Sequence, residues 1–302
     1  MKHIVLIIGN GFDLDLGLKT SYSDFINTGV LNNYCNNPLI DELLRCHRLQ
    51  SWIDIEEFLR NQAIATQLHP CTIEDIINGY GIIRAKLLEY IKALPYNTIN
   101  NDCMAIRVLS AIVKEDANAQ IFNFNYTNLR EICNSCFIGR HANIFPIHGE
   151  GHNDSIILGF DDDAEIRHEE YGCMIKSHSP YYRSANINKA LVNADEIVFF
   201  GHSLGSTDYH YFRNFFRSRV NENCINESTP KRIRIFTYDE PARQKILLQI
   251  RNMNDRKTNM LYDLNDFRIY RTVEDRHKIE QYCNEGFGTP IKGRANYDIR
   301  FK

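Results

Sequence analysis

The sequence predicts an α/β protein with a central parallel sheet of about six strands and a helical insertion between the first two strands. Six short runs rich in β-branched or aromatic residues predict the strands, and helical stretches alternate with them. The first and fourth runs are almost continuously apolar, which is typical of strands covered on both faces. The six runs are residues 4–8, 120–126, 143–147, 196–200, 232–238 and 267–271.

The long interval between the first two strands predicts the insertion. Apolar residues recur there at helical spacing, from 52 to 59 and from 73 to 94. We expect Trp52 to anchor the packing of these helices, and Glu56 and Glu57 to lie on a solvated face. The predicted division is an α/β core of residues 1–34 and 116–284, a helical insertion of residues 35–115, and an irregular tail of residues 285–302.

Composition excludes several classes of protein. With 43% hydrophobic and 24% charged residues the chain resembles ordinary globular proteins, and no run approaches the ~20 apolar residues of a membrane helix. A net charge of −3 argues against nucleic acid as a partner. The apolar run at 4–8 is too short for a signal peptide, so we expect a cytoplasmic protein. Cys133 and Cys136 form the only C-x-x-C, and a single pair argues against structural zinc.

A glycine turn follows the first predicted strand. Gly9-Asn10-Gly11 would let the backbone turn tightly and let a ligand approach its amides, which is the usual setting for a nucleotide phosphate. A plain tight turn explains the two glycines equally well, because Leu14 stands where the dinucleotide fingerprint has its third glycine. Further on, Ser21-x-x-Asp24 is a capping pattern that predicts the start of a helix.

Two polar side chains follow the next two predicted strands. Asn125 and His148 stand at carboxyl ends of strands, where parallel sheets bind their ligands, so we expect both in one pocket. Asn125 could instead cap a turn, and His148 could be a core imidazole with a satisfied hydrogen bond. Histidine titrates near neutral pH, which suits it to act as a general base.

The fourth strand runs into Gly201-His202-Ser203-Leu204-Gly205, which permits two interpretations. As the G-x-S-x-G of a nucleophile elbow, it would make Ser203 the nucleophile of a serine esterase, with Asp239 and His277 as partners. The alternative is implied by a family resemblance given in the next paragraph, in which backbone amides and the hydroxyl of this serine hold a nucleotide. We favour the second interpretation, because it also uses Gly9, Gly11, Asn125 and His148, and we expect Asp208 to cap the helix that follows.

The sequence carries two family resemblances. The string GNGFDLDLGLKTSYSDF at residues 9–25, with WIDIEEF at 52–58, resembles the AbiH family of phage-defence proteins. The run Gly9-Asn10-Gly11-Phe12-Asp13, followed by Gly17-Leu18, has the glycine spacing of the sirtuin phosphate loop. Asn125, His148-Gly149 and Gly201-His202-Ser203-Leu204 are similar to further sirtuin motifs.

These resemblances imply a Rossmann-like, sirtuin-like core that binds NAD or a related nucleotide and hydrolyses its nicotinamide glycosidic bond. Asn125 would then position the ribose or the attacking water, and His148 would be the general base. The implied binding residues are Gly9, Asn10, Gly11, Phe12, Asp13, Gly201, Ser203 and Asp208. Asp13 stands where the sirtuin loop has serine, and a carboxylate beside a pyrophosphate is unfavourable unless it holds a ribose hydroxyl or a cation.

Other partners and functions stay open at this stage. A nucleotide-sensing module without catalysis is the main alternative to an NAD glycohydrolase, and a phage-derived trigger and a homo-oligomer are compatible with either. The acidic turn Gly159-Phe160-Asp161-Asp162-Asp163 is a candidate Mg²⁺ site centred on Asp161, although solvated loop charges are the commoner case.

Overall fold

The computed structural model describes residues 3–50, 53–65, 72–136, 138, 143–221 and 230–284. Trp52 and the tail of residues 285–302 lie outside the described residues, so the expectations for them stay predictions.

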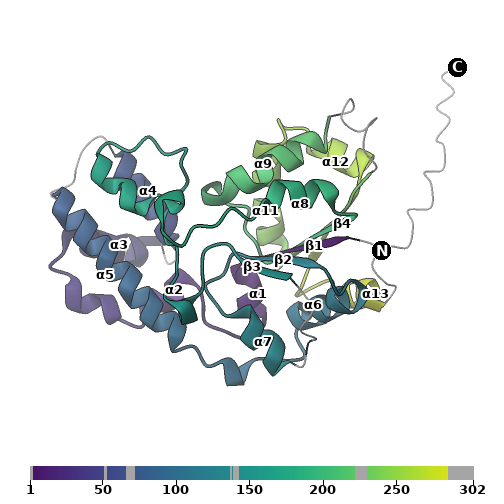
Figure 1. The fold of residues 1–302 in the computed structure, drawn as a ribbon, viewed down its shortest axis with the longest axis horizontal. Helices are drawn as coiled ribbons and strands as arrows, with labels where there is room; N and C mark the ends of the chain where they lie inside the picture. The colour runs from purple at the N-terminus through teal and green to yellow at the C-terminus, as the bar shows by residue number, and fades with distance from the viewer. Residues whose placement is uncertain are drawn as a thin grey trace, which may run out of the picture.

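A single sheet of six parallel strands forms the centre of the molecule (Figure 1). Its strands are β1 (Ile4–Ile8), β2 (Gln120–Asn123), β3 (Asn143–Pro146), β4 (Glu196–Phe200), β5 (Arg232–Thr237) and β6 (Asp266–Arg271). They lie in the order β3-β2-β1-β4-β5-β6, and every neighbouring pair is parallel. The predicted α/β class and Rossmann-like sheet are confirmed. Five strands lie within one residue of their predicted bounds, and β2 ends three residues before its predicted end.

Helices cover both faces of the sheet, as the continuous apolar runs predicted. One face carries α1 (Asn10–Asp15), α6 (Met104–Glu115), α7 (Leu129–Ser135) and α13 (Arg276–Asn284), and the other carries α8 (Ile187–Asn193), α9 (Tyr209–Ser218), α11 (Glu240–Met253) and α12 (Thr258–Leu264) (Figure 1). Alternate residues of β1 serve the two faces: Ile4, Leu6 and Ile8 pack on the first, and Val5 and Ile7 on the second.

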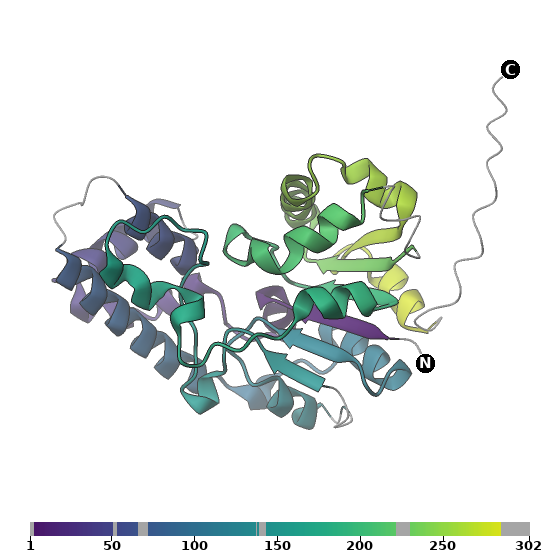
Figure 2. The ribbon, with the colours of Figure 1, turned by 45° about the horizontal axis from the view of Figure 1, so that its top comes forward.

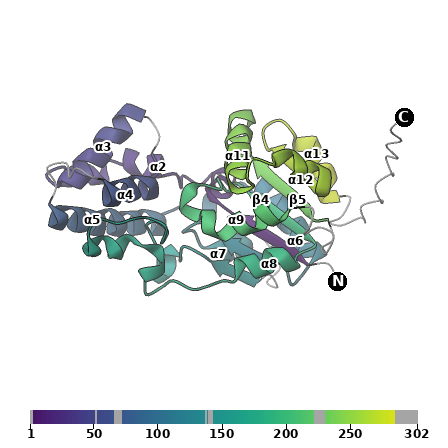
Figure 3. The same cartoon turned by 90° about the horizontal axis from the view of Figure 1, so that it is seen from above.

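The remaining helices form a helical cap at one end of the molecule (Figures 2 and 3). Its helices are α2 (Tyr22–Asn27), α3 (Pro38–Gln50), α4 (Ile55–Ile64) and α5 (Ile73–Lys92), and they share one hydrophobic cluster with residues of the later segment 156–175. The helical insertion between the first two strands is therefore present. The described residues also form short 3-10 helices: η1 (Val30–Tyr34), η2 (Tyr96–Thr98), η3 (Gly151–Asn153), η4 (Glu169–Met174), η5 (Lys176–His178) and η6 (Ser206–Asp208).

The packing groups three parts of the chain differently from the predicted division, while the predicted domain boundaries themselves stay predictions. Helix α6 packs in the cluster of the sheet, whereas α2 and the segment 156–175 pack with the helical cap. The predicted capping box at the start of α2 is present: Asp24 N donates to Ser21 Oγ at 3.0 Å, and Ser21 N donates to Asp24 Oδ2 at 3.2 Å. In the described residues no helix is both long and apolar enough to cross a bilayer.

Candidate functional site

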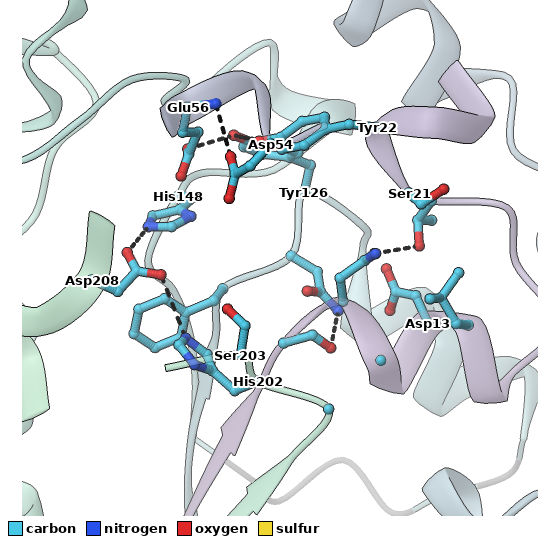
Figure 4. A pocket seen from close by; sticks show the side chains of 18 of the residues that line it. Asp13, Ser21, Tyr22, Asp54, Glu56, Tyr126, His148, His202, Ser203 and Asp208 are labelled. Atoms are coloured by element: carbon cyan, nitrogen blue, oxygen red, sulfur yellow. Dashed lines mark hydrogen bonds and ion pairs between the residues drawn. The ribbon is translucent and has the colours of Figure 1, made fainter. Parts of the chain in front are cut away.

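A cavity of about 430 Å³ lies at the carboxyl edge of the sheet, between the sheet and the helical cap. Residues that follow β1, β2, β3, β4 and β5 line it, and residues of the helical cap close it from the other side (Figure 4). Nine of the ten predicted site residues line this cavity: Gly9, Asn10, Gly11, Asp13, Asn125, His148, Gly201, Ser203 and Asp208. The tenth, Phe12, is buried in the hydrophobic core, where its ring and that of Phe200 form a T-shaped pair with centroids 5.6 Å apart.

The glycines bring two loops into contact at the point where the strand order reverses. Gly9 N donates to Phe200 O at 3.0 Å, and Gly11 N donates to Gly201 O at 2.9 Å. A Cβ on Gly11 would come within 2.7 Å of the Gly201 Cα, and Gly201 itself has φ +64°. The amides of Gly9 and Gly11 are thus already bonded, and the observed reason for glycine is the close approach of the β1 and β4 loops.

Asp13 lies on the cavity wall with almost no exposure to solvent. Thr127 Oγ1 donates to its Oδ2 at 2.9 Å. Burial raises the pKa of Asp13 to about 7, because a charged carboxylate loses its hydration there, and the hydrogen bond from Thr127 only partly opposes this effect. The carboxyl group is therefore partly neutral near pH 7, which removes much of the repulsion that a fixed charge would exert on a phosphate.

Asn125 and His148 both face the cavity, as predicted. Asn125 Nδ2 donates to Gly9 O at 3.1 Å, and its backbone N donates to Asn123 Oδ1 at 3.1 Å. These bonds fix the side chain, while its amide oxygen makes no hydrogen bond within the described residues. The ring of His148 stands between Asp208 and the cavity (Figure 4).

Asp208 does not cap α9, contrary to the prediction. Its side chain makes no capping hydrogen bond, and its Oδ1 lies 3.1 Å from His148 Nε2 and 3.1 Å from Lys176 Nζ. Burial alone would raise its pKa, but the charge of Lys176 and the contact with His148 hold the pKa well below the usual range. The carboxylate therefore stays ionised and orients a histidine instead of a helix terminus.

The contacts of Lys176 indicate which nitrogen of His148 carries the proton. Its Nζ has three protons and three oxygen acceptors: Glu56 Oε2 at 3.0 Å, Asp208 Oδ1 at 3.1 Å and Thr207 O at 3.3 Å. Although His148 Nε2 lies 3.3 Å from Nζ, it is not needed as an acceptor. We therefore assign the proton of His148 to Nε2, where it is donated to Asp208, and the free electron pair to Nδ1.

A second histidine flanks the same carboxylate. His202 Nδ1 accepts a hydrogen bond from Leu204 N at 3.0 Å, so its proton is on Nε2, 3.6 Å from Asp208 Oδ2. Burial lowers the pKa of His202 to about 4, because charging an enclosed imidazole is costly. This histidine stays neutral at physiological pH, and its Nε2 lies near Asp208 at a distance longer than a hydrogen bond.

The helical cap supplies groups that the sequence analysis missed. Glu56 is buried, contrary to the prediction of a solvated face, while Glu57 is exposed as predicted. Glu56 Oε1 accepts from Tyr126 OH at 3.2 Å, and Tyr126 OH lies 3.3 Å from Tyr22 OH. Asp54 caps α4 through Glu56 N at 2.9 Å, and burial next to Glu56 raises its pKa to about 6.

The nucleophile-elbow interpretation of Ser203 has no geometric support. Strand β4 ends at Phe200 and η6 begins only at Ser206, so Ser203 lies in an extended loop and not at the apex of a strand-to-helix turn. Its Oγ accepts from Gly205 N at 3.3 Å. Asp239 instead caps α11 through Ala242 N, and His277 lies on α13 and does not line the cavity.

The acidic turn at residues 159–163 is only partly the solvated loop that the sequence favoured, because its first carboxylate is buried. Asp161 is buried, and its Oδ2 lies 2.7 Å from His210 Nδ1 on α9, while Asp162 and Asp163 are exposed. Within the described part of the chain, no group of three His, Cys, Asp or Glu side chains is arranged to hold a metal ion. The Mg²⁺ suggestion therefore stays an untested prediction.

These features define the class of the protein: an α/β fold with a histidine-bearing cavity at the switch point of a parallel sheet. The profile of the family described as "Bacteriophage abortive infection AbiH" matches residues 5–226, which is most of the chain. The chain belongs to the AbiH family, and this membership indicates a role in phage abortive infection. No curated protein matches the chain.

Proposed function

We propose that this AbiH protein binds NAD or a closely related nucleotide in the cavity and hydrolyses the bond between nicotinamide and ribose. The observation that carries the proposal is His148, which lines the cavity. Its Nε2 is held by Asp208 at 3.1 Å, while its Nδ1 makes no hydrogen bond within the described residues. A histidine held in this way is equipped to accept a proton from water.

The strand order supports a nucleotide as the ligand. An open parallel sheet of order 3-2-1-4-5-6 binds dinucleotides at the point where the order reverses, between the first and fourth strands. That point is lined here by Gly9, Gly11 and Gly201, and the cavity extends from it to both sides.

The charge of the cavity supports a cationic reacting group. Asp54, Glu56 and Asp208 bring carboxyl groups to its wall, and Lys176 is the cation that contacts two of them. In the proposed reaction the C1′–N bond of the nicotinamide ribose breaks, and its electron pair neutralises the ring nitrogen of nicotinamide. The sugar carbon carries positive charge in the transition state, and nearby carboxylates stabilise such charge.

The proposed step assigns separate roles to the side chains. Water forms the new bond to C1′ and gives its proton to His148 Nδ1, so that nicotinamide, ADP-ribose and one proton are the products. The amide oxygen of Asn125 accepts a hydrogen bond from the attacking water or from a ribose hydroxyl. Asp208 holds the imidazolium that results, since it is ionised and hydrogen-bonded to Nε2.

The test is nicotinamide release from NAD, followed by chromatography. We expect His148→Ala to lower kcat by about 10²–10⁴-fold with little change in KM, because it removes the base and leaves the rest of the cavity in place. His152→Ala is the matched control, since His152 is exposed and does not line the cavity, and it should leave kcat unchanged. Equal activity of His148→Ala and wild type would refute the assigned base.

A sensing function without catalysis is the second candidate, and the link between cap and core favours it. Glu56 belongs to the helical cap and contacts Lys176, which in turn contacts Asp208 beside the ligand space. A nucleotide bound there would bias how the cap rests on the sheet. NAD that binds, slows hydrogen exchange in α4 and stays intact would favour this function, whereas NAD that does not bind would exclude it as the ligand of either function.

A further inference from the structure

The cavity has a second arm, on the β5 side of the switch point, that the reacting groups do not use. Thr237 and Tyr238 line it from the end of β5, and Ala242, Lys245 and Ile246 line it from α11. Asn125 and His148 lie on the opposite side, after β2 and β3. The arm therefore belongs to the same cavity but lies away from the proposed reaction.

The separation of the two arms sets the size of the ligand. In the order β3-β2-β1-β4-β5, four strand spacings lie between the strand before His148 and the strand before Tyr238. At about 4.8 Å each, these spacings add up to about 19 Å. One nucleoside is too short to occupy both arms, whereas two nucleosides joined by a phosphate bridge are long enough.

Tyr238 presents its ring from a fixed backbone. The carbonyl oxygen of Tyr238 accepts from Val273 N at 3.2 Å, and that of Thr237 accepts from Thr272 N at 2.8 Å. The next residue, Asp239, is the N-cap of α11. Although its backbone is held on both sides, Tyr238 is 67% exposed, one of the largest exposed fractions among the hydrophobic side chains of the described residues. An exposed aromatic ring on a backbone held in this way, at a cavity wall, is suited to stack on a planar ligand.

The other residues of the arm suit the same kind of ligand. Ile246 is buried and provides an apolar floor, and Ala242 leaves room because its side chain is a single methyl group. Lys245 adds a cation to the same wall, where an anionic bridge of phosphates would leave the switch point.

We propose that Tyr238, with Thr237, Ala242 and Ile246, forms a subsite for the second nucleobase of a dinucleotide, with adenine as the base in NAD. This inference rests on the proposed function, since it takes the first nucleoside to be bound beside His148. The base stacks on the ring of Tyr238, and the subsite selects dinucleotides over mononucleotides.

The experiment compares two probes by isothermal titration calorimetry on the full chain. ADP-ribose keeps the adenine end and has no nicotinamide bond left to hydrolyse, and nicotinamide mononucleotide lacks the adenine. We expect Tyr238→Ala to weaken the binding of ADP-ribose about tenfold, as the loss of one stacked base predicts, and to leave nicotinamide mononucleotide unchanged. Tyr238→Phe keeps the stacking ring and should bind ADP-ribose within about twofold of wild type.

Tyr181→Ala is the matched control, because Tyr181 is also an exposed tyrosine and does not line the cavity. The subsite is overturned, and the proposed function is left standing, if Tyr238→Ala binds ADP-ribose as tightly as wild type or weakens both probes equally. Failure of wild type to bind either probe overturns the subsite and the proposed function together.

Discussion

Replacing Lys176 by methionine tests the buried charge network directly. The Lys176 side chain is 2% exposed, and its two carboxylate partners, Glu56 and Asp208, are 7% and 10% exposed. Methionine fills a similar volume but supplies neither charge nor donors. The two buried carboxylates would then repel each other, because no cation would lie between them.

The expected cost follows from this burial. Removal of one partner from a buried ion pair typically costs about 3–5 kcal/mol, because the remaining charge is left unpaired in a poorly solvated place. Exposed ion pairs contribute about 0–1 kcal/mol. Lys92→Met is the matched control, since Lys92 pairs with Asp154 at side-chain exposures of 42% and 62%.

The assay is urea unfolding of five proteins: wild type, Lys176→Met, Glu56→Gln, the double variant and the Lys92→Met control. In the double variant the carboxylate charge of Glu56 is removed together with the cation, so we expect it to recover at least about 1 kcal/mol relative to the sum of the single losses. Strict additivity of the two losses, or a loss for Lys176→Met no larger than that for Lys92→Met, would refute the network as described.

Two further perturbations follow from the β1 turn and its surroundings. Gly201→Ala should destabilise the fold by on the order of 3 kcal/mol in urea unfolding, since φ is +64° and a Cβ would overlap the Phe12 backbone nitrogen. Gly81→Ala in α5 is the control: the added Cβ meets no atom within 4 Å, so this substitution should stabilise the fold by up to about 1 kcal/mol. Equal effects of the two substitutions would contradict the close loop contact. Asp13→Asn should gain stability relative to wild type as pH rises from about 4 to above 7. The wild-type carboxyl has a folded pKa raised from 3.8 to about 7, so the stability it contributes is complete below pH 3.8 and is lost as pH rises through 7, by about 4 kcal/mol at 1.4 kcal/mol per pH unit. A pH-independent difference between the two proteins would show that Asp13 ionises normally.

The sheet could be predicted from the sequence because each strand is indicated by the apolar pattern of its own few residues. The run 4–8 is apolar at every position and the run 196–200 at every position but Glu196, and this pattern is typical of strands buried on both faces. Asn125, His148 and Ser203 could be placed for the same reason, since the carboxyl ends of parallel strands always meet at one edge. The start of α2 was equally local, because a capping box is made by residues three apart.

The failures of prediction concern side chains whose partners are remote in sequence. Asp208 has the residue type and the position of a helix cap. Only the tertiary structure, which places His148 and Lys176 next to it, shows that its carboxylate contacts these two side chains instead. Glu56 and Glu57 are adjacent glutamates on one helix, yet one is buried against Lys176 and the other is exposed. Lys176 itself lies in a segment without any recognisable motif.

The sequence by itself thus determined the parallel α/β fold, the helical insertion, the AbiH resemblance, and the edge of the sheet where the cavity lies. Only the tertiary structure decided the charge state and hydrogen-bonding role of each group in that cavity. The hydrophobic periodicity of a helix or strand, and the residues at which it begins and ends, depend on neighbouring residues and can therefore be predicted from local patterns. The ionisation of Asp13, the proton position on His148 and the pairing of Lys176 depend on burial and on groups from distant elements, and these exist only after the cap has packed against the sheet.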